Sequence, residues 1–497
     1  MQVIDWIILL AYVALVVGLG CWFVRKSSTS DEFIAAGRSL PGWVVGLSVF
    51  GTFVSSISFL ANPGKSFDAN WNPFVFSLSL PMAAWIATKW FVPFYRTLGT
   101  VSAYDHLESR FGLWARLYAV CCYLLTQVGR VGSIMFLVAQ VLETATGAPI
   151  AVIIVATGFL VTLYTLLGGI EAVIWTDALQ SVVLTLGIMV TLVVIPMEVP
   201  GGVGGILDVA VEHRKFSLGS FGASLGESTF WMVLIYGLFI NLQNFGIDQS
   251  YVQRYATART ERGAKGSVWL GALLYVPISA FLFLIGTGLF ALYQSRPELA
   301  PAGGFAAGDR VFAYFIVHQL PAGLTGLLMA AIFSAAMSSV DSSLNSAATL
   351  TLCDFYRRLS KRPIGEQESM RILHWATIFW GCVGTGAALA MIGVKSVLDL
   401  WWSIASIASG GMLGLFLLGM LSRRAGSREA LWGTLSGLLP ILWITWTSLN
   451  HKLPMGYRLR EDLRFPGHSN LAIVVGTMAI LFVGWGLSRR RPLRSES

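Results

Sequence analysis

A run of polar residues follows a long apolar stretch late in the chain, and its residue types suit the binding of a cation. Seven of the nine residues from Ser338 to Ser346 are polar, and the apolar residues 324–337 precede them. On a helix, four of these polar residues share one face: Ser338, Asp341, Ser342 and Asn345. Hydrocarbon cannot hydrate such a face, so it must contact protein, water or an ion. Oxygen ligands without Cys or His suit a hard cation, and the pattern predicts a Na⁺ site.

Serine in a membrane helix also has an ordinary structural role. Its hydroxyl can bond back to the carbonyl one turn earlier or to a neighbouring helix. That role accounts for one or two serines, but it does not account for a carboxylate within a run of seven polar residues.

A second acidic residue, Asp177, lies near the expected cytoplasmic start of the apolar segment 172–195. An Asp at a helix end is often a solvated cap. Within a membrane it is a natural cation ligand. We therefore expect Asp177 and Asp341 to share an ion, or to share a proton if they lie close enough to repel each other.

Arg130 lies in the middle of the apolar segment 117–146, between Gly129 and Gly132. A buried Arg is costly unless it meets an anion, and its planar guanidinium matches a carboxylate. The alternative is a structural ion pair with an intramembrane acid. The two glycines leave room beside Arg130 for a ligand or for a closely packed helix.

Hydroxyl residues cluster in the segment 51–64, which ends at Pro63 and Gly64. This pattern is typical of a discontinuous helix, whose free carbonyls bind a cation and whose free N–H groups bind an anion. A polar segment occupies the corresponding place in the second half of the chain, at 228–253, with Asn241, Gln243, Asn244 and Asp248. Two such segments at matching positions predict an inverted-repeat transporter.

The elements that must hold these residues are membrane helices. Of the 497 residues 55% are hydrophobic and 12% are charged, where a soluble protein has about 25% charged. We expect an all-α polytopic membrane protein with about thirteen spans of roughly 20 residues. Their ranges are 4–24, 42–62, 71–95, 117–146, 150–167, 172–195, 228–253, 268–293, 321–351, 372–393, 397–420, 428–449 and 470–488.

These spans are expected to form a single transmembrane domain over 1–497. An extra span and loop (1–40) precede the first repeat (41–195), the second repeat covers 228–420, and two spans follow (421–497). The first apolar stretch lacks a basic leader and a cleavage site, so it is expected to be retained as a span.

The net charge of +8 follows topology. With the N-terminus outside and the C-terminus cytoplasmic, the cytoplasmic loops hold more than twice as many Lys and Arg as the outer loops. This assignment places Arg254 in a cytoplasmic loop with Arg259, Arg262 and Lys265. The charge therefore predicts a multi-pass protein with the lipid bilayer, and no nucleic acid, as a partner.

Several other classes are disfavoured. The five cysteines form no CxxC pair, the six histidines are scattered, and no HExxH or Walker motif is present. We expect neither an enzyme nor an ATP-driven pump. A passive channel would predict flux without sodium dependence or saturation.

The chain resembles the sodium:solute symporter family over about residues 1–430. The strings that carry the resemblance are residues 335–346, 168–177 and 249–255. Within the family it is most similar to the bacterial sialic acid symporters, through Ser48-Val49-Phe50, Ser55-Ser56-Ile57 and Gly129-Arg130-Val131. The resemblance implies a leucine-transporter-type inverted repeat of five plus five helices, with an added N-terminal helix, in a bacterial inner membrane.

It also implies three sites. The first Na⁺ site would combine backbone carbonyls with two hydroxyls: Gly51, Val54, Ala335, Ser338 and Ser339. The second Na⁺ site would use Asp177, Ser338, Asp341 and Ser342. The substrate carboxylate would be held by Arg130, beside Ser55 and Ser58.

This chain departs from the sialic acid symporters at three positions. Asp341 stands where they have serine, and Pro73 and Ser77 stand where a phenylalanine and a glutamine line their sugar pocket. The expected function is a monomeric symporter driven by one or two Na⁺ ions that imports a carboxylated sugar, N-acetylneuraminate first, by alternating access. The alternatives are a uronate, a monocarboxylate or a neutral sugar.

Overall fold

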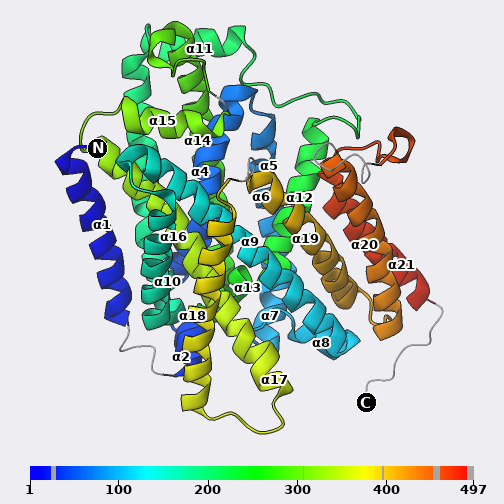
Figure 1. Ribbon diagram of the computed structural model, residues 1–497. Coiled ribbons are helices and arrows are strands. Elements are labelled where there is room, and N and C mark those ends of the chain that lie inside the picture. The colour runs from blue at the N-terminus through cyan, green and yellow to red at the C-terminus, as the bar shows by residue number, and fades with distance from the viewer. Residues whose placement is uncertain (24–28, 306, 394–396, 451–458, 490–497) are drawn as a thin grey trace.

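The computed structural model describes residues 1–23, 29–305, 307–393, 397–450 and 459–489, and within these residues the named elements are all helices (Figure 1). Ten helices are long and apolar enough to cross a membrane, and a bent pair brings the number to eleven. The expected all-α, polytopic membrane architecture is thus confirmed.

Each expected span overlaps a helix or a helical run. These are α1 Val3–Trp22, α3 Gly42–Phe53 with α4 Ser56–Asp68, the run Asn72–Leu98 from η3 to α7, α9 Leu113–Thr146, α10 Ile150–Glu198, α12 Phe230–Ile247 with α13 Gln249–Thr257, α14 Glu261–Ser295, α16 Leu324–Leu350, α18 Glu366–Ala390, α19 Val397–Leu421, α20 Ser427–Leu449 and α21 Leu471–Ser488.

The range of α10 contains two helices joined at Gly169, whose φ of 59° and ψ of −159° are not helical. Tyr164 and Asp177 would lie about 20 Å apart on a straight helix. Both nevertheless bond to neighbouring turns of α16, Tyr164 to Asp341 and Asp177 to Ser338. The chain therefore turns at Gly169, where a side chain would meet the Phe33 backbone about 3 Å away and the positive φ would be strained.

The second expected span is broken, and α3 and α4 meet at an angle of 54°. The sequence suggested that Pro63 and Gly64 would interrupt it, and that expectation is wrong. The break lies at Val54, and Pro63 lies inside α4. Ser55 starts α4 as its N-cap, because its hydroxyl accepts from the Ser58 N–H.

The corresponding segment in the second half is also interrupted. α12 ends at Ile247 and α13 starts at Gln249, with Asp248 in an extended conformation between them. The Asp248 carboxylate accepts the Ser250 N–H at 2.8 Å and caps α13. Both polar segments that the sequence singled out are therefore interrupted helices.

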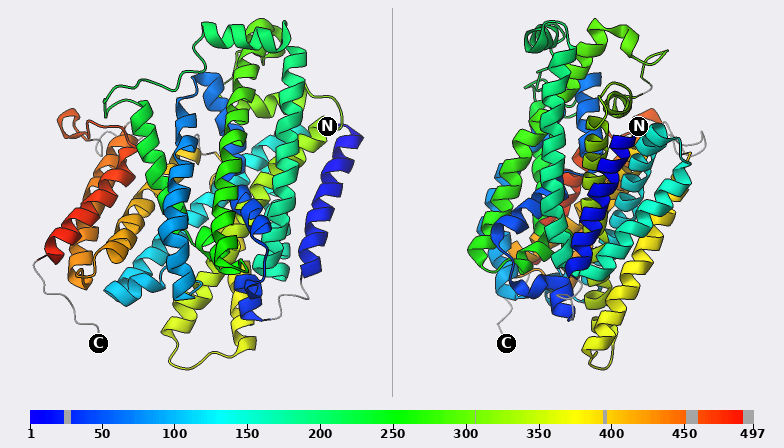
Figure 2. Two further views of the ribbon diagram at one scale, coloured as in Figure 1. Left: turned by 180° about the vertical axis from the view of Figure 1, so that it is seen from behind. Right: turned by 90° about the vertical axis from the view of Figure 1, so that its left-hand side faces the viewer.

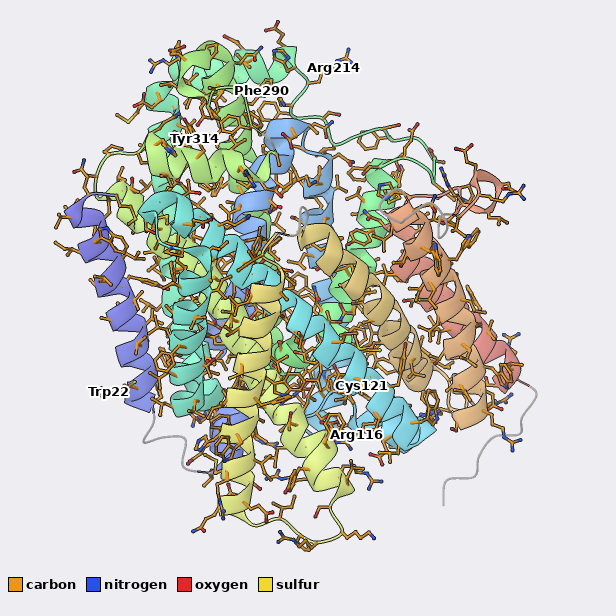
Figure 3. All side chains as sticks on the ribbon, in the orientation of Figure 1. Trp22, Arg116, Cys121, Arg214, Phe290 and Tyr314 are labelled. Atoms are coloured by element: carbon orange, nitrogen blue, oxygen red, sulfur yellow. The ribbon has the colours of Figure 1, made fainter. Side chains whose placement is uncertain are left out.

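The two ends of the bundle carry different elements. The short helices α11 (Gly202–Glu212) and α15 (Asp309–His318) lie at the end where α1 begins, and α2 (Ser30–Ala35) and α17 (Arg357–Leu359) lie at the other (Figures 1 and 2). Figure 3 places Arg214 at the first end and Arg116 toward the second.

Arg116 pairs with Asp105, Glu108 and Asp354 at 2.6–2.9 Å. Hydrogen bonding from Arg358 to Glu108 lowers the pKa of that carboxyl.

Close packing of α14 against α4 predicts a strong effect of one methyl group. A Cβ at Gly286 would lie 2.0 Å from the Pro63 carbonyl oxygen, a backbone atom that cannot move without α4. We expect Gly286→Ala to destabilise the protein by about 1–3 kcal/mol, measured as a lower melting temperature and a lower yield in detergent. Gly266→Ala is the matched control, because Gly266 lies on the same helix with open space around its Cβ. Equal stability of the two variants would contradict the packing argument.

Candidate functional site

The break between α3 and α4 frees the two carbonyls that the sequence assigned to a cation. In a continuous helix the N–H groups of Ser55 and Ser58 would donate to the carbonyls of Gly51 and Val54. Instead, the Ser55 N–H donates to the Phe53 carbonyl and the Ser58 N–H donates to the Ser55 hydroxyl. The carbonyls of Gly51 and Val54 thereby lose their helical partners, as a cation ligand must.

Helix α16 approaches α3 at this break. A Cβ on Gly51 would lie 3.1 Å from the Ser338 hydroxyl oxygen, so only a glycine allows this approach without displacing Ser338. The next residue of α16 is Ser339, and its hydroxyl donates to the Ala335 carbonyl, one turn earlier, at 3.2 Å. Gly51 on α3 therefore lies directly beside the turn of α16 that carries Ala335, Ser338 and Ser339.

The polar face of α16 is fully inside the protein, and some of its hydroxyls also have the ordinary structural role. Ser339, Ser342 and Ser343 bond to the carbonyls one turn earlier. A hydroxyl that donates in this way keeps its oxygen lone pairs. Back-bonding thus leaves these oxygens able to contact a cation.

Asp177 is completely buried within α10, which excludes the solvated helix cap. Its Oδ1 accepts from the Ser338 hydroxyl at 2.5 Å, and its Oδ2 accepts from the Ser48 hydroxyl at 2.5 Å and from Arg254 at 2.8 Å. Asp177 therefore joins α3, α13 and α16 at one point.

Asp341 is also fully buried and lies on the same side of α16. Its Oδ2 accepts from the Tyr164 hydroxyl at 2.7 Å, and its Oδ1 lies 3.4 Å from the Ser342 hydroxyl. The four residues expected at the second cation site are thus brought together: Asp177, Ser338, Asp341 and Ser342.

The assignment of Arg254 to a cytoplasmic loop is wrong. Its side chain is 0% exposed and pairs with Asp177. It also donates to the hydroxyls of Ser48 and Ser342 at 2.8 and 2.7 Å and to the Ser250 carbonyl. The helix resumes after Asp248 as α13, and this short helix carries Arg254 into the core.

Arg130 reaches the broken helix from α9. It is partly buried, and its Nη2 donates to the Thr52 carbonyl at 3.1 Å. The structural ion pair that was its alternative role is not found among the described residues. Gly132 serves close helix packing, since its Cβ position lies 3.0–3.2 Å from Met391 and Ala387. Arg130 therefore keeps donors available beside the break.

The serines expected near the substrate lie at the start of α4, directly after the break. The hydroxyls of Ser55 and Ser58 are 3.4 Å apart. Ser77 is buried and bonds to Ser279 at 2.7 Å, and Pro73 lies one turn before it in η3, Asn72–Phe74. No hydrogen bond joins Ser77 to Arg130 in the part of the chain that is described, so contact of Ser77 and Pro73 with a sugar stays a prediction.

Aromatic rings lie beside this region. The Phe53 ring, one residue before the break, packs against Phe245, Tyr251 and Tyr275, with centroids 4.8–5.6 Å apart. The Tyr275 hydroxyl interacts with Ser58 and Ser77. Rings and hydroxyls together suit a ligand with both apolar and polar faces.

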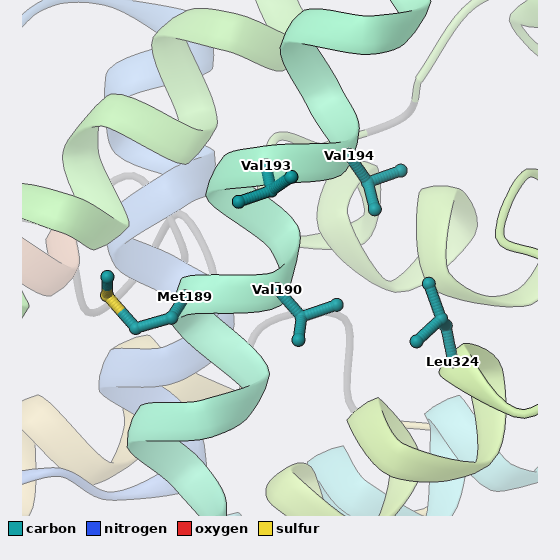
Figure 4. Close-up of a pocket in the computed structure, with 5 residues that line it drawn as sticks. All are labelled: Met189, Val190, Val193, Val194 and Leu324. Carbon is teal, nitrogen blue, oxygen red and sulfur yellow. The ribbon is translucent and has the colours of Figure 1, made fainter.

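A hollow on the outside of the bundle has a different character (Figure 4). It is lined by Met189, Val190, Val193 and Val194 of α10 and by Leu324 of α16. The Val193 side chain is 62% exposed. An apolar lining without donors suits lipid and offers nothing to a carboxylate.

Asp177, Asp341 and the side chains that bond to them form one acidic cluster. Reasoning from the sequence missed three of its members: Ser48, Tyr164 and Arg254. A signal existed for Arg254. It directly follows the segment 228–253, which carries the intramembrane Asp248, and a basic residue inside the membrane is costly unless it is paired. Ser48 lies one turn before Thr52 on the broken helix. No local feature marked Tyr164, since its contact spans 177 residues of sequence.

The site combines a broken helix, two carbonyls that have lost their helical partners, a buried acidic cluster and an arginine beside the break. This combination defines a secondary transporter of the class with discontinuous helices. Residues 33–437 match the sodium:solute symporter family, and the chain belongs to that family.

Curated relatives are similar over nearly the whole chain. The chain is 33% identical to the sodium/sialic acid symporter NanT of Aliivibrio fischeri over 97% of its length and 92% of that protein. It is also 33% identical to the sodium/sialic acid symporter SiaT of Proteus mirabilis, over 97% and 94%. The mouse sodium-coupled monocarboxylate transporter 2 is 29% identical, over 90% of this chain and 73% of that protein.

Solved structures agree in fold. A Na⁺-coupled sialic acid symporter in a substrate-bound outward-open state superposes with a TM-score of 0.91 at 31% identity, covering 100% of this chain and 99% of the other. The transporter Mhp1 in a closed conformation matches with a TM-score of 0.59 at 17% identity, over 95% and 97%, and it supports the fold alone.

Proposed function

We propose that this protein is a Na⁺-coupled symporter that imports a carboxylated sugar, N-acetylneuraminate, by alternating access. The observation that carries the proposal is Arg130 beside the α3–α4 break, where the carbonyls of Gly51 and Val54 have lost their helical partners. Placing the anion site and the cation site on one broken helix lets both ligands favour the same conformation, which is the basis of coupling.

The cations in this proposal are cargo that moves with the sugar. The first is held by the carbonyls of Gly51, Val54 and Ala335 and the hydroxyls of Ser338 and Ser339, and the second by the acidic cluster. Each Na⁺ that enters at a potential of 100 mV adds about 2.3 kcal/mol of driving force.

The proposed membrane arrangement has thirteen spans. The helix break at Gly169 divides α10 into two, α3 and α4 form one, and α19 supplies another. The spans form five-plus-five repeats after an extra N-terminal helix, in an inner membrane with the N-terminus outside, and a monomer is the working unit. This orientation is tested by labelling the exposed Cys21, near the cytoplasmic end of α1, with a thiol reagent. We expect labelling only from the cytoplasmic side of sealed vesicles.

A second substrate class is favoured by the monocarboxylate transporters among the relatives. Arg130 recognises a carboxylate, whatever body the rest of the solute has. A monocarboxylate without a sugar ring would leave Ser77 and Pro73 without a role.

The proposal is tested by uptake of radiolabelled N-acetylneuraminate into proteoliposomes with and without an inward Na⁺ gradient. We expect accumulation above equilibrium only with the gradient, and competition by excess unlabelled sugar. Uptake of lactate but not of N-acetylneuraminate would shift the substrate to a monocarboxylate. Equal uptake in sodium and choline would reject symport.

A further inference from the structure

The acidic cluster has an uneven charge balance. It holds two carboxylates, Asp177 and Asp341, and one guanidinium, Arg254, and all three side chains are excluded from solvent. Among the described residues, Arg254 forms an ion pair with Asp177 and with no other acid. The cluster therefore has one carboxylate more than it has built-in cations, and an uncompensated charge inside a membrane protein is costly.

The hydrogen bonds show which carboxylate lacks a counter-ion. Both oxygens of Asp177 have short contacts, with Ser338 on one side and with Ser48 and Arg254 on the other. Asp341 receives one short side-chain bond, from Tyr164, and its other hydrogen bonds come from its neighbour Ser342, whose hydroxyl lies 3.4 Å from Oδ1. Both partners of Asp341 are uncharged, and no ion pair reaches it among the described residues, so Asp341 is the carboxylate without a built-in counter-ion.

We propose that Arg254 is a built-in counter-ion that neutralises Asp177, and that Asp341 is the residue that holds the second cation. This inference deepens the proposed function and rests on it. Asp177 then acts as a positioning residue, because it fixes Ser338 and Arg254 around the cation without being the cation's main partner.

If Arg254 neutralises Asp177, the affinity of the cluster for a cation depends on its net charge and not only on its number of ligand oxygens. Asp177→Asn leaves Arg254 facing Asp341, so the cluster is neutral and its cation affinity is lost. Removing both members of the pair, with Asp177→Asn and Arg254→Gln together, leaves Asp341 as the single charge. The double variant should regain the affinity that the single variant loses.

The experiment measures Na⁺ binding without transport. The melting temperature of the purified full chain is followed in detergent as NaCl replaces choline chloride, and the half-maximal Na⁺ concentration is recorded. We expect it to rise at least tenfold in Asp177→Asn and in Asp341→Asn, and to return within threefold of wild type in the double variant. An unchanged response in Asp341→Asn, or a double variant as weak as Asp177→Asn, overturns the proposal.

Arg254→Lys supplies a second test that keeps the positive charge and is less prone to misfolding. The half-maximal Na⁺ concentration should stay within threefold of wild type, and a tenfold rise would show that the guanidinium acts by more than its charge. The same measurement separates failure of the proposed function from failure of the roles assigned to Arg254 and Asp341. A wild-type protein without any Na⁺-dependent stabilisation defeats the proposed function, whereas a responsive wild type with an unrescued double variant defeats only this inference.

Discussion

Replacing Arg130 by alanine is expected to abolish uptake of a carboxylated sugar while leaving the amount of transporter in the membrane unchanged. Arg130 lies beside the helix break and donates to the Thr52 carbonyl, and no acid among the described residues pairs with it. Removing one partner of a buried charge pair, here the arginine that faces the substrate carboxylate, costs about 3–5 kcal/mol. The affinity for the substrate should therefore fall at least roughly a hundredfold, measured as initial uptake rates against sugar concentration.

Arg130→Lys is the matched comparison for this variant. Lysine keeps the charge but loses the planar pair of donors that fits a carboxylate, so an intermediate affinity is expected. Na⁺-dependent stabilisation should persist in both variants, because Arg130 is separate from the cation ligands. Normal uptake by Arg130→Ala would remove Arg130 from the substrate site, and loss of the protein from the membrane would assign it a structural role.

Replacing Ser338 by alanine is expected to weaken the response to Na⁺ at both proposed cation sites. Ser338 lies against Gly51 on one side, and its hydroxyl bonds to Asp177 on the other at 2.5 Å. The change removes one ligand oxygen and leaves a buried carboxylate oxygen unpaired, at a cost of about 1–3 kcal/mol. The Na⁺ concentration for half-maximal uptake should rise roughly fivefold or more.

Ser334→Ala is the control for this prediction. Ser334 is a buried serine one turn earlier on the same helix, and its hydroxyl bonds to Tyr12 of α1, outside the proposed sites. It should leave the Na⁺ dependence close to wild type. If Ser338→Ala behaves like Ser334→Ala, Ser338 is not shared between two cation sites.

The functional regions were visible in the sequence because the membrane makes polar residues expensive. A carboxylate, an arginine and runs of serine inside apolar segments require partners, and these features indicated α16, Asp177, Arg130 and the segment 51–64. The hydroxyl residues of the segment 51–64 also predicted a discontinuous helix, but its interruption was expected at Pro63 and Gly64, whereas the break lies at Val54 and Pro63 lies inside α4.

The membrane-helical architecture, the family and the polar regions were thus determined by the sequence alone, since hydrophobic length and the cost of buried charge act locally along the chain. Which charges meet was decided only by the tertiary structure. Arg254 follows Asp177 by 77 residues, and a count of loop charges placed it in the cytoplasm. The turn at Gly169, the interruption at Asp248 and the approach of Gly51 to Ser338 bring distant segments within hydrogen-bonding distance. Pairing of this kind depends on packing between helices, which no local pattern encodes.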